Sequence, residues 1–157
     1  MGKIMKDIKR ILFVCTGNSC RSIMAEGYME KRLEEEKMPI EIRSAGTLGV
    51  DDMPASDLSI EVLKKEGVSA NGLKSTGLTE DLIKWADIVL VMEPIHKERI
   101  ITDMPEVSEK VLFLRDFGDE TGNLVIPDPI GRPMAFYRVS FQIIKKSIEG
   151  LIEWLKK

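Results

Sequence analysis

The residues with the clearest chemical potential lie in one short segment near the start of the chain. In order, it reads Cys15, Thr16, Gly17, Asn18, Ser19, Cys20, Arg21 and Ser22. A glycine-containing turn that leads into a helix directs backbone N–H groups toward one point, which suits a tetrahedral oxyanion. The planar fork of Arg21 can hold two phosphate oxygens at once. The same positive field favours a thiolate, so we expect a lowered pKa for Cys15 and a nucleophilic role at neutral pH.

The elements on either side of this segment must hold it in place. Residues 10–15 (RILFVC) form an apolar, β-rich run that is typical of a strand buried on both faces. Residues 22–37 have apolar side chains at helical spacing, and Pro39 interrupts that pattern. The segment is therefore predicted to be the turn between a strand and a helix. In parallel sheets, this carboxyl end of a strand is where ligands bind.

The rest of the chain alternates between strand-like and helix-like segments. Further strands are predicted at residues 40–45, 87–92 and 110–114, helices at 56–66, 79–85, 133–157 and from Pro94 onward, and a long loop at 117–132. This alternation predicts an α/β fold with a four-stranded parallel sheet, helices on both faces and a phosphate-binding loop after the first strand. Residues 1–157 are expected to form a single domain.

Composition excludes several function classes. The 157 residues include 23 Lys and Arg against 26 Asp and Glu, a formal charge of −3, so we expect no basic stripe that binds nucleic acid. No apolar run is long enough to span a membrane, and the first residues (MGKIMKDIKRI) lack the pattern of a secretory signal. The two cysteines, Cys15 and Cys20, are expected to be reduced thiols in the cytoplasm.

With its flanking residues, the segment resembles the opening motif of the low-molecular-weight protein tyrosine phosphatases. That motif reads VC-x-GN-x-CRS, and this chain has VCTGNSCRS followed by Met24-Ala25-Glu26. The resemblance continues through Ser44-Ala45-Gly46, the run at 87–92 (DIVLVM) and Asp128-Pro129 in the late loop. It covers nearly the whole chain. It implies a hydrolase that acts on phosphorylated protein substrates, binds phosphate-like oxyanions and needs neither a metal nor a cofactor.

The resemblance also implies roles for individual residues. Cys15 attacks phosphorus and forms a phosphocysteine, while Arg21 and the amides of residues 16–22 hold the phosphate oxygens. Asp128 protonates the leaving oxygen as a general acid and then activates water as a general base. Ser22 can donate a hydrogen bond to the Cys15 sulfur, which makes the thiolate a better leaving group.

Three further positions have supporting roles by the same resemblance. Asn18 is expected to hold the shape of the loop, with Ser44 nearby. Cys20 matches the family's second cysteine and is a candidate for reversible pairing with Cys15 under oxidation. A buried small hydrophobic side chain is an equally good interpretation of Cys20.

The expected walls of the site depart from the phosphotyrosine pattern of the family. Phosphotyrosine members have aromatic residues in two wall loops, where this chain has residues 48–53 (LGVDDM) and 130–132 (IGR). A histidine of the family's loop-supporting network is replaced by Leu73 in our alignment. Ser19 stands where a phosphoarginine-hydrolysing subgroup has Thr and phosphotyrosine enzymes have Ile. Phosphotyrosine hydrolysis is the main hypothesis, and protein arginine phosphatase activity is the alternative.

Two other function classes are possible on a fold of this kind. A thiol-dependent arsenate reductase on this fold needs further cysteines in a downstream loop, and no cysteine follows Cys20. A non-catalytic anion-binding module would make Cys15 and Asp128 dispensable. His96, the only histidine, follows a predicted helix start, and we expect it at the surface or in a capping role.

Overall fold

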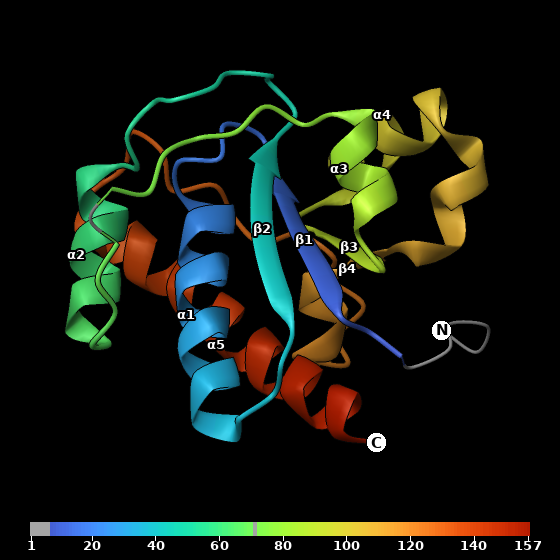
Figure 1. The fold of residues 1–157 in the computed structure, drawn as a ribbon. Coiled ribbons are helices and arrows are strands. Elements are labelled where there is room, and N and C mark those ends of the chain that lie inside the picture. Colours follow the sequence, from blue (N-terminus) through green and yellow to red (C-terminus); the bar gives the residue numbers. More distant parts are fainter. Residues whose placement is uncertain (1–6, 71) are drawn as a thin grey trace.

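A parallel sheet of four strands forms the centre of the fold. The computed structural model describes residues 7–70 and 72–157. The strands are β1 (Arg10–Cys15), β2 (Glu41–Gly46), β3 (Ile88–Val91) and β4 (Val111–Phe113), in the order β2-β1-β3-β4. All three neighbouring pairs are parallel. The predicted sheet is therefore confirmed (Figure 1).

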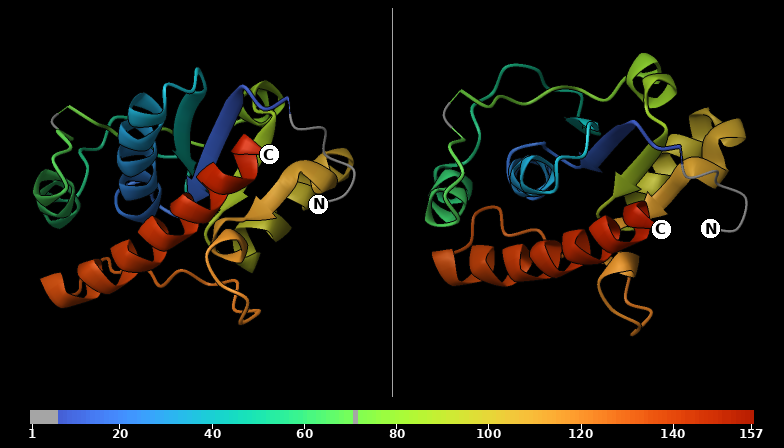
Figure 2. Two further views of the ribbon diagram at one scale, coloured as in Figure 1. Left: turned by 90° about the horizontal axis from the view of Figure 1, so that it is seen from below. Right: turned by 60° about the horizontal axis from the view of Figure 1, so that its bottom comes forward.

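Helices cover both faces of this sheet, as predicted (Figures 1 and 2). The helices are α1 (Arg21–Glu36), α2 (Asp57–Lys65), α3 (Glu80–Trp85), α4 (Pro94–Asp103) and α5 (Met134–Lys156). One face packs against α1 and α5, with α2 beside them, and the other packs against α3 and α4. Each layer buries its own hydrophobic core against the sheet.

The sequence of β1 explains why this strand lies inside the sheet. Ile11, Phe13 and Cys15 belong to the core under α1 and α5, whereas Leu12 and Val14 belong to the core under α3 and α4. Because both faces are covered, every one of these positions has to be apolar, not every second one. The strand is held from all sides, and its last residue, Cys15, is fixed in position.

The connections diverge at the carboxyl ends of β1 and β3. The chain leaves β1 through α1 and reaches β2 on one side, whereas β3 and β4 continue the sheet on the other side. A crevice forms at such a switch point because no crossover helix covers it. Cys15 ends β1 at this point, and Glu93 follows directly after β3.

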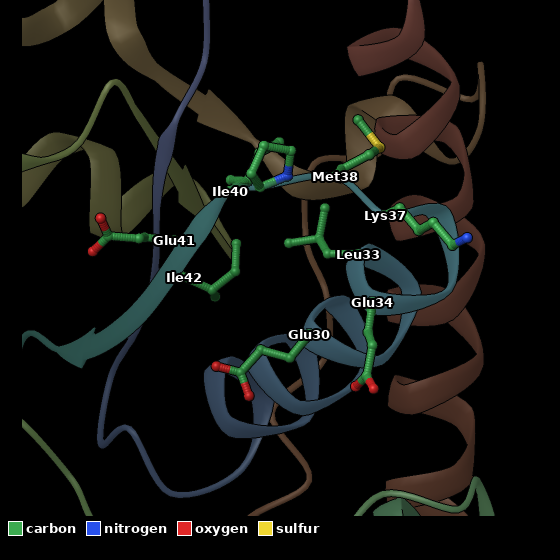
Figure 3. Close-up of a pocket in the computed structure, with 9 residues that line it drawn as sticks. Glu30, Leu33, Glu34, Lys37, Met38, Ile40, Glu41 and Ile42 are labelled. Carbon is green, nitrogen blue, oxygen red and sulfur yellow. The ribbon is translucent and has the colours of Figure 1, made fainter.

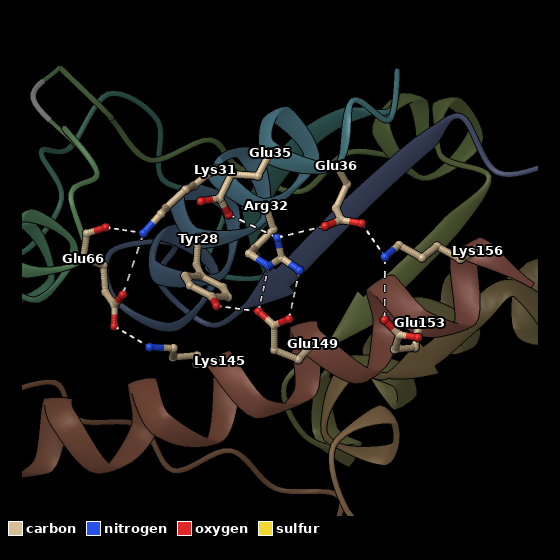
Figure 4. Close-up of polar contacts among 10 residues, drawn as sticks. All are labelled: Tyr28, Lys31, Arg32, Glu35, Glu36, Glu66, Lys145, Glu149, Glu153 and Lys156. Carbon is tan, nitrogen blue, oxygen red and sulfur yellow. Dashed lines mark hydrogen bonds and ion pairs between the residues drawn. The ribbon is translucent and has the colours of Figure 1, made fainter.

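A polar network on the surface holds α5 along α1 and α2 (Figure 4). Glu149 of α5 accepts hydrogen bonds from the Tyr28 hydroxyl and from Arg32 Nε, the latter at 2.8 Å. Lys145 of α5 contacts Glu66, just after α2, at 2.8 Å. The network ties the last helix to residues 79 to 121 positions earlier in the sequence.

The position of α5 matters for the preceding loop. Ser140 of α5 donates a hydrogen bond of 2.6 Å to the Pro127 carbonyl. The Ile126 amide donates to the Met92 carbonyl just after β3, at 2.9 Å. These two contacts attach the loop that carries Asp128 to the carboxyl edge of the sheet.

The observed elements differ from the predicted ones mainly around β4. Two 3-10 helices, η1 (Pro105–Lys110) and η2 (Leu114–Phe117), were not predicted, and they shorten the expected strand at 110–114 to three residues. Among the described residues, no helix has the length and apolar character needed to cross a bilayer. The first six residues, part of the stretch used to judge a secretory signal, lie outside the described residues.

Candidate active site

A cavity of about 180 Å³ opens where β1 ends. It is lined by the predicted segment and by residues from two later loops: Cys15, Thr16, Gly17, Ser19, Cys20, Arg21, Leu48, Asp128 and Ile130. The structure thus brings together the three predicted catalytic residues, Cys15, Arg21 and Asp128. A volume of this size, with a guanidinium and main-chain amides in its wall, suits a phosphoryl group on a side chain.

A larger cavity of about 560 Å³ lies at the opposite ends of the strands (Figure 3). It is formed between the end of α1 and the start of β2, where Glu41 pairs with Arg10. Glu30 and Glu34 of α1 also line it. Its lining has three carboxylates, one ammonium (Lys37) and neither a thiol nor a guanidinium, so the phosphate-binding chemistry belongs to the smaller cavity.

The Cys15 sulfur receives hydrogen bonds from within its own loop. Ser22 Oγ lies 2.9 Å from Cys15 Sγ, and the Asn18 amide donates to the sulfur at 3.3 Å. The Asn18 side-chain amide donates one hydrogen to Ser22 Oγ (2.6 Å) and the other to Ser44 Oγ (2.9 Å). Since Ser22 Oγ accepts from Asn18, its own proton is free to point at the sulfur. The Asn18 side chain thus lies between Ser22 and Ser44, the arrangement expected from the family resemblance.

The backbone of Asn18 explains why this residue type suits the position. Its φ of 54° lies in the left-handed region, which asparagine tolerates better than most residues. Its side-chain oxygen accepts the Thr76 amide at 2.8 Å. Gly46 at the end of β2 allows the loop to approach, since a Cβ there would lie 2.6 Å from the Thr16 carbonyl oxygen. The neighbouring strand therefore helps to shape the loop.

Glu26 completes this network, and the sequence analysis did not single it out. Ser44 Oγ donates to Glu26 Oε1 at 2.6 Å. Burial raises the pKa of the Glu26 carboxyl, and the hydrogen bond from Ser44 lowers it in part. Glu26 belongs to the Met-Ala-Glu stretch that carries the family resemblance, and a carboxylate among apolar helix positions was the available signal. Glu26 acts on Cys15 only through Ser44, Asn18 and Ser22.

Arg21 is the largest polar side chain in the interior, with 2% exposure. Its Nη1 donates to Glu93 Oε2 at 2.6 Å and to the Ile126 carbonyl at 2.9 Å. Its Nη2 donates to Thr16 Oγ1 at 3.2 Å. Glu93 was missed in the sequence, although its position directly after a central strand was a usable signal. These partners compensate the buried charge and fix the plane of the guanidinium.

His96 is buried (1% exposed), so the expected surface or capping role is wrong. Its Nε2 lies 2.9 Å from Thr16 Oγ1, the same atom that accepts from Arg21. Burial and the charge of Arg21 lower the pKa of His96 to about 4. The ring therefore packs as a neutral group against the phosphate-binding loop. His96 lies in α4, which follows β3, and it reaches the phosphate-binding loop because β3 pairs in parallel with β1.

Asp128 lies at the mouth of the cavity. Its side chain is 36% exposed, and its Oδ2 lies 3.6 Å from Arg21 Nη2. Its Oδ1 accepts the Ile130 amide at 3.1 Å, a contact that orients the carboxyl group. A carboxyl group in contact with solvent at the edge of an anion site can exchange protons with both a leaving group and water.

The pKa of Cys15 moves in the direction opposite to our prediction. Burial raises the pKa of the Cys15 thiol, and the hydrogen bonds from Ser22, the charge of Arg21 and the Asn18 amide lower it only in part. Cys15 is 3% exposed, and desolvation disfavours the charged form of its sulfur. A strand that is covered on both faces buries its final side chain as well. Thiolate formation therefore depends on the donors around the sulfur, above all on Ser22.

Cys20 lies in the same cavity wall as Cys15, and both are free thiols. Its sulfur lies 3.4 Å from the Tyr137 hydroxyl and donates to Ser56 Oγ at 3.5 Å. Cys20 is buried and hydrogen-bonded, so it is more than a small hydrophobic side chain. Its reversible pairing with Cys15 remains a prediction.

The walls beside the phosphate-binding loop are small and aliphatic. Ser19 lies within the loop, and Leu48 and Ile130 come from the two flanking loops. Leu48 is 66% exposed and Ile130 54% exposed, so both stand at the rim. None of the described residues that line the cavity is aromatic, as the sequence predicted.

Comparisons with known proteins agree with this geometry. A family model described as low molecular weight phosphotyrosine protein phosphatase matches residues 10–157. A protein-arginine-phosphatase from Geobacillus stearothermophilus is 38% identical over 148 residues, which is 94% of this chain and 96% of that protein. The low molecular weight protein tyrosine phosphatase from T. tengcongensis has a solved structure with a TM-score of 0.86 and 36% identity, covering 93% of this chain and 99% of that one.

A third similar protein was solved with a phosphate analogue. Vibrio vulnificus Wzb in complex with benzylphosphonate has a TM-score of 0.81 and 30% identity, covering 95% of this chain and 98% of that one. The similarity to these proteins extends over almost the full length of the chain.

Proposed function

The chain belongs to the low molecular weight phosphotyrosine protein phosphatase family, and on this premise we propose which of its residues carry the reaction. It is a hydrolase of the protein tyrosine phosphatase type, and phosphotyrosine in proteins is the proposed substrate. Cys15 is the nucleophile, Arg21 and the amides of residues 16–22 bind the phosphoryl oxygens, and Asp128 is the general acid and base. The reaction passes through a phosphocysteine intermediate.

In the first step, the Cys15 thiolate attacks phosphorus. The S–P bond forms while the bond between phosphorus and the phenolic oxygen breaks, and the protonated Asp128 carboxyl gives its proton to that oxygen. The three remaining oxygens carry negative charge throughout. Arg21 is already fixed by Glu93 and by the Ile126 carbonyl, so little reorganisation is needed when the charge develops.

In the second step, water attacks phosphorus and Asp128, now a carboxylate, accepts a proton from it. The S–P bond breaks and its electron pair returns to sulfur, which releases inorganic phosphate. The Ser22 hydroxyl, 2.9 Å from the sulfur, stabilises the departing thiolate. The proton balance closes, because the proton that Asp128 gives in the first step is replaced in the second.

The observation that carries this proposal is the meeting of Cys15, Arg21 and Asp128 on one cavity of phosphoryl size. Rapid mixing with 4-nitrophenyl phosphate should give a burst of nitrophenol, and acid-quenched mass spectrometry should place a phosphoryl group on Cys15. Cys15→Ser should abolish the burst. Cys20→Ser is the matched control and should retain it, since Cys20 is directed at Tyr137 and Ser56. A normal burst in Cys15→Ser would refute nucleophilic catalysis by this residue.

The aliphatic wall supports protein arginine phosphatase activity as a second candidate. A flat phenyl ring has no aromatic partner among the described residues that line the cavity, whereas Ser19 offers a hydroxyl and Asp128 a carboxylate to a guanidinium. The relative from G. stearothermophilus is named for this activity. Turnover of phosphotyrosine and phosphoarginine should be compared in the unmodified protein and in Ser19→Ile. A shift toward phosphotyrosine in Ser19→Ile supports the second candidate, and unchanged selectivity contradicts it.

The proposal includes the cytoplasm as the site of action. Both cysteines are free, and the nucleophile has to remain a reduced thiol. In an oxidising compartment, Cys15 would be lost to disulfide or sulfenic acid formation.

A further inference from the structure

Another cavity, of about 370 Å³, adjoins the catalytic cavity; it is called the second cavity below and is distinct from the 560 Å³ cavity at the other end of the sheet. It is lined by Thr16, Thr47, Ile95, His96, Glu98, Arg99 and Thr102. Thr16 lines both cavities, and the adjacent residues Thr47 and Leu48 line one each. A chain that places a side chain in the catalytic cavity therefore has the second cavity immediately beside it.

The outer wall of this second cavity is one face of α4. Ile95, Glu98, Arg99 and Thr102 follow the spacing i, i+3, i+4 and i+7, which aligns side chains along one side of a helix. The helix begins after β3, at the carboxyl edge of the sheet that also holds the catalytic cavity (Figure 1). Ile95 is 62% exposed and offers an apolar contact on this face.

Arg99 is the feature of this cavity that points to a ligand. Its guanidinium forms no ion pair or hydrogen bond with any described residue. Arg99 and Thr47 also line a smaller neighbouring cavity, so two uncommitted donors stand side by side. Glu80 and Asp103 also line that smaller cavity, Asp103 one helical turn after Arg99 on α4, and neither forms an ion pair with Arg99. Glu98 lines only the second cavity.

We propose that this second cavity binds an acidic residue adjacent to the phosphorylated residue of a protein substrate, with Arg99 and Thr47 as its donors. The inference rests on the proposed function, because it assigns substrate selection to the surface next to the catalytic cavity. An Arg fork and a hydroxyl together match a carboxylate. Ile95 packs against the aliphatic part of the same residue.

Phosphopeptides test this proposal directly. One series carries Glu, Ala or Lys at each of the three positions on either side of the phosphorylated residue, in phosphotyrosine and phosphoarginine versions. The unmodified protein should favour Glu at one flanking position. Arg99→Gln should lower kcat/KM for that peptide about 3- to 5-fold through KM, the range of an exposed ion pair. The Ala peptide and 4-nitrophenyl phosphate should be unaffected.

Two further variants make the test specific. Lys64→Gln removes one positive charge from an exposed position on α2, remote from the second cavity, and should change none of these rates. Arg99→Glu should reverse the preference, so that the Lys peptide becomes the better substrate at the same position.

Three results would overturn the proposal: no preference for Glu in the unmodified protein, a preference that survives Arg99→Gln, or an equal loss for all substrates. A preference for Lys that depends on Glu98 would also overturn it. The proposed function is judged separately, by the burst with 4-nitrophenyl phosphate and its loss in Cys15→Ser.

Discussion

At the scale of single residues, the direction of two hydroxyl protons decides how the nucleophile is activated. The Asn18 amide donates both of its hydrogens, to Ser22 Oγ and to Ser44 Oγ. Each hydroxyl then has one proton left: the Ser44 hydroxyl donates its proton to Glu26 Oε1, and we propose that the Ser22 hydroxyl donates its proton to the Cys15 sulfur, 2.9 Å away. The amide thus orients the donor that favours the thiolate. Burial opposes it, and the balance between them sets the reactivity of the sulfur.

Ser22→Ala should raise the pKa of Cys15 by about 1–2 units, because a charge-assisted hydrogen bond to the thiolate is lost. The measurement is the pH dependence of Cys15 alkylation by iodoacetamide, with the modified residue identified by mass spectrometry. Ser19→Ala is the control, since the Ser19 hydroxyl contacts the Cys20 sulfur instead. Equal alkylation profiles for the unmodified protein and Ser22→Ala would contradict the proposed orientation of the Ser22 proton.

Asp128→Asn should slow the hydrolysis of phenyl phosphate by about 10²- to 10⁴-fold, the usual contribution of a positioned general acid. The loss should be smaller for 4-nitrophenyl phosphate, because nitrophenolate leaves without needing a proton. The ratio of the two rates, measured in the first turnover, separates proton transfer from binding. An equal loss for both substrates would assign Asp128 to binding instead. Because the Asp128 side chain is 36% exposed, its replacement by Asn should not unfold the protein, and a folding defect would not account for the lost activity.

At the scale of elements, the phosphate-binding loop depends on the strand next to it. The loop lies between β1 and α1, but β2 ends against it, and Gly46 is the point of contact. The Leu48 amide donates to the Thr16 carbonyl and the Ser56 amide to the Ser19 carbonyl, each at 3.0 Å. The segment after β2 therefore follows the loop and completes its outer wall. An error in strand packing would be transmitted directly to the catalytic cavity.

Gly46→Ala should destabilise the protein by about 1–3 kcal/mol, because the added Cβ would meet backbone atoms that cannot move aside freely. The contacts would be 2.6 Å to the Thr16 carbonyl oxygen and 2.9 Å to the Asn18 amide nitrogen. Urea unfolding at neutral pH measures the change. Gly17→Ala is the control for stability, since its nearest contact would be Ser19 Oγ at 3.6 Å. If both variants were equally stable, the close approach would not constrain the loop.

At the scale of the whole molecule, the active site is joined to both helical layers. His96 of α4 reaches the loop from one side of the sheet, and Glu26 of α1 supports it from the other. The loop that carries Asp128 is attached through Pro127 to α5, which the network around Glu149 holds against α1. Titration of a buried group in this arrangement therefore affects global stability.

Acid should destabilise the protein through His96. Its pKa is lowered to about 4 in the folded state, against 6.5 for an ordinary histidine. Between these values the unfolded chain binds a proton that the folded chain does not, so stability falls as the pH drops from about 6.5 to 4. The contribution is about 2–3 kcal/mol.

His96→Gln should remove this contribution and flatten the pH dependence of the free energy of unfolding over that range. Urea unfolding at pH 7 and pH 4.5 gives the comparison. No second histidine complicates it. An unchanged difference between the two pH values would show that His96 is not the group responsible.

The sequence by itself determined the local part of the site. Cys15, Asn18, Arg21 and Ser22 lie within eight consecutive positions, where the turn between a strand and a helix dictates their relative placement. Short apolar runs, and the alternation of apolar residues at 40–45, were enough to place all four strands to within about two residues. Asp128 and Ser44, by contrast, were found through the resemblance to a family.

The tertiary structure alone decided what surrounds those residues. Glu93 and His96 meet the loop only because β3 pairs with β1, a contact between segments some 75 positions apart. Sequence spacing contains no information on which strands become neighbours. The pKa of Cys15 was mispredicted for the same reason, since desolvation depends on the helices that pack over the end of β1. The order of residues therefore determines which groups meet in the phosphate-binding loop, whereas burial in the tertiary structure determines how far the pKa of Cys15 is shifted.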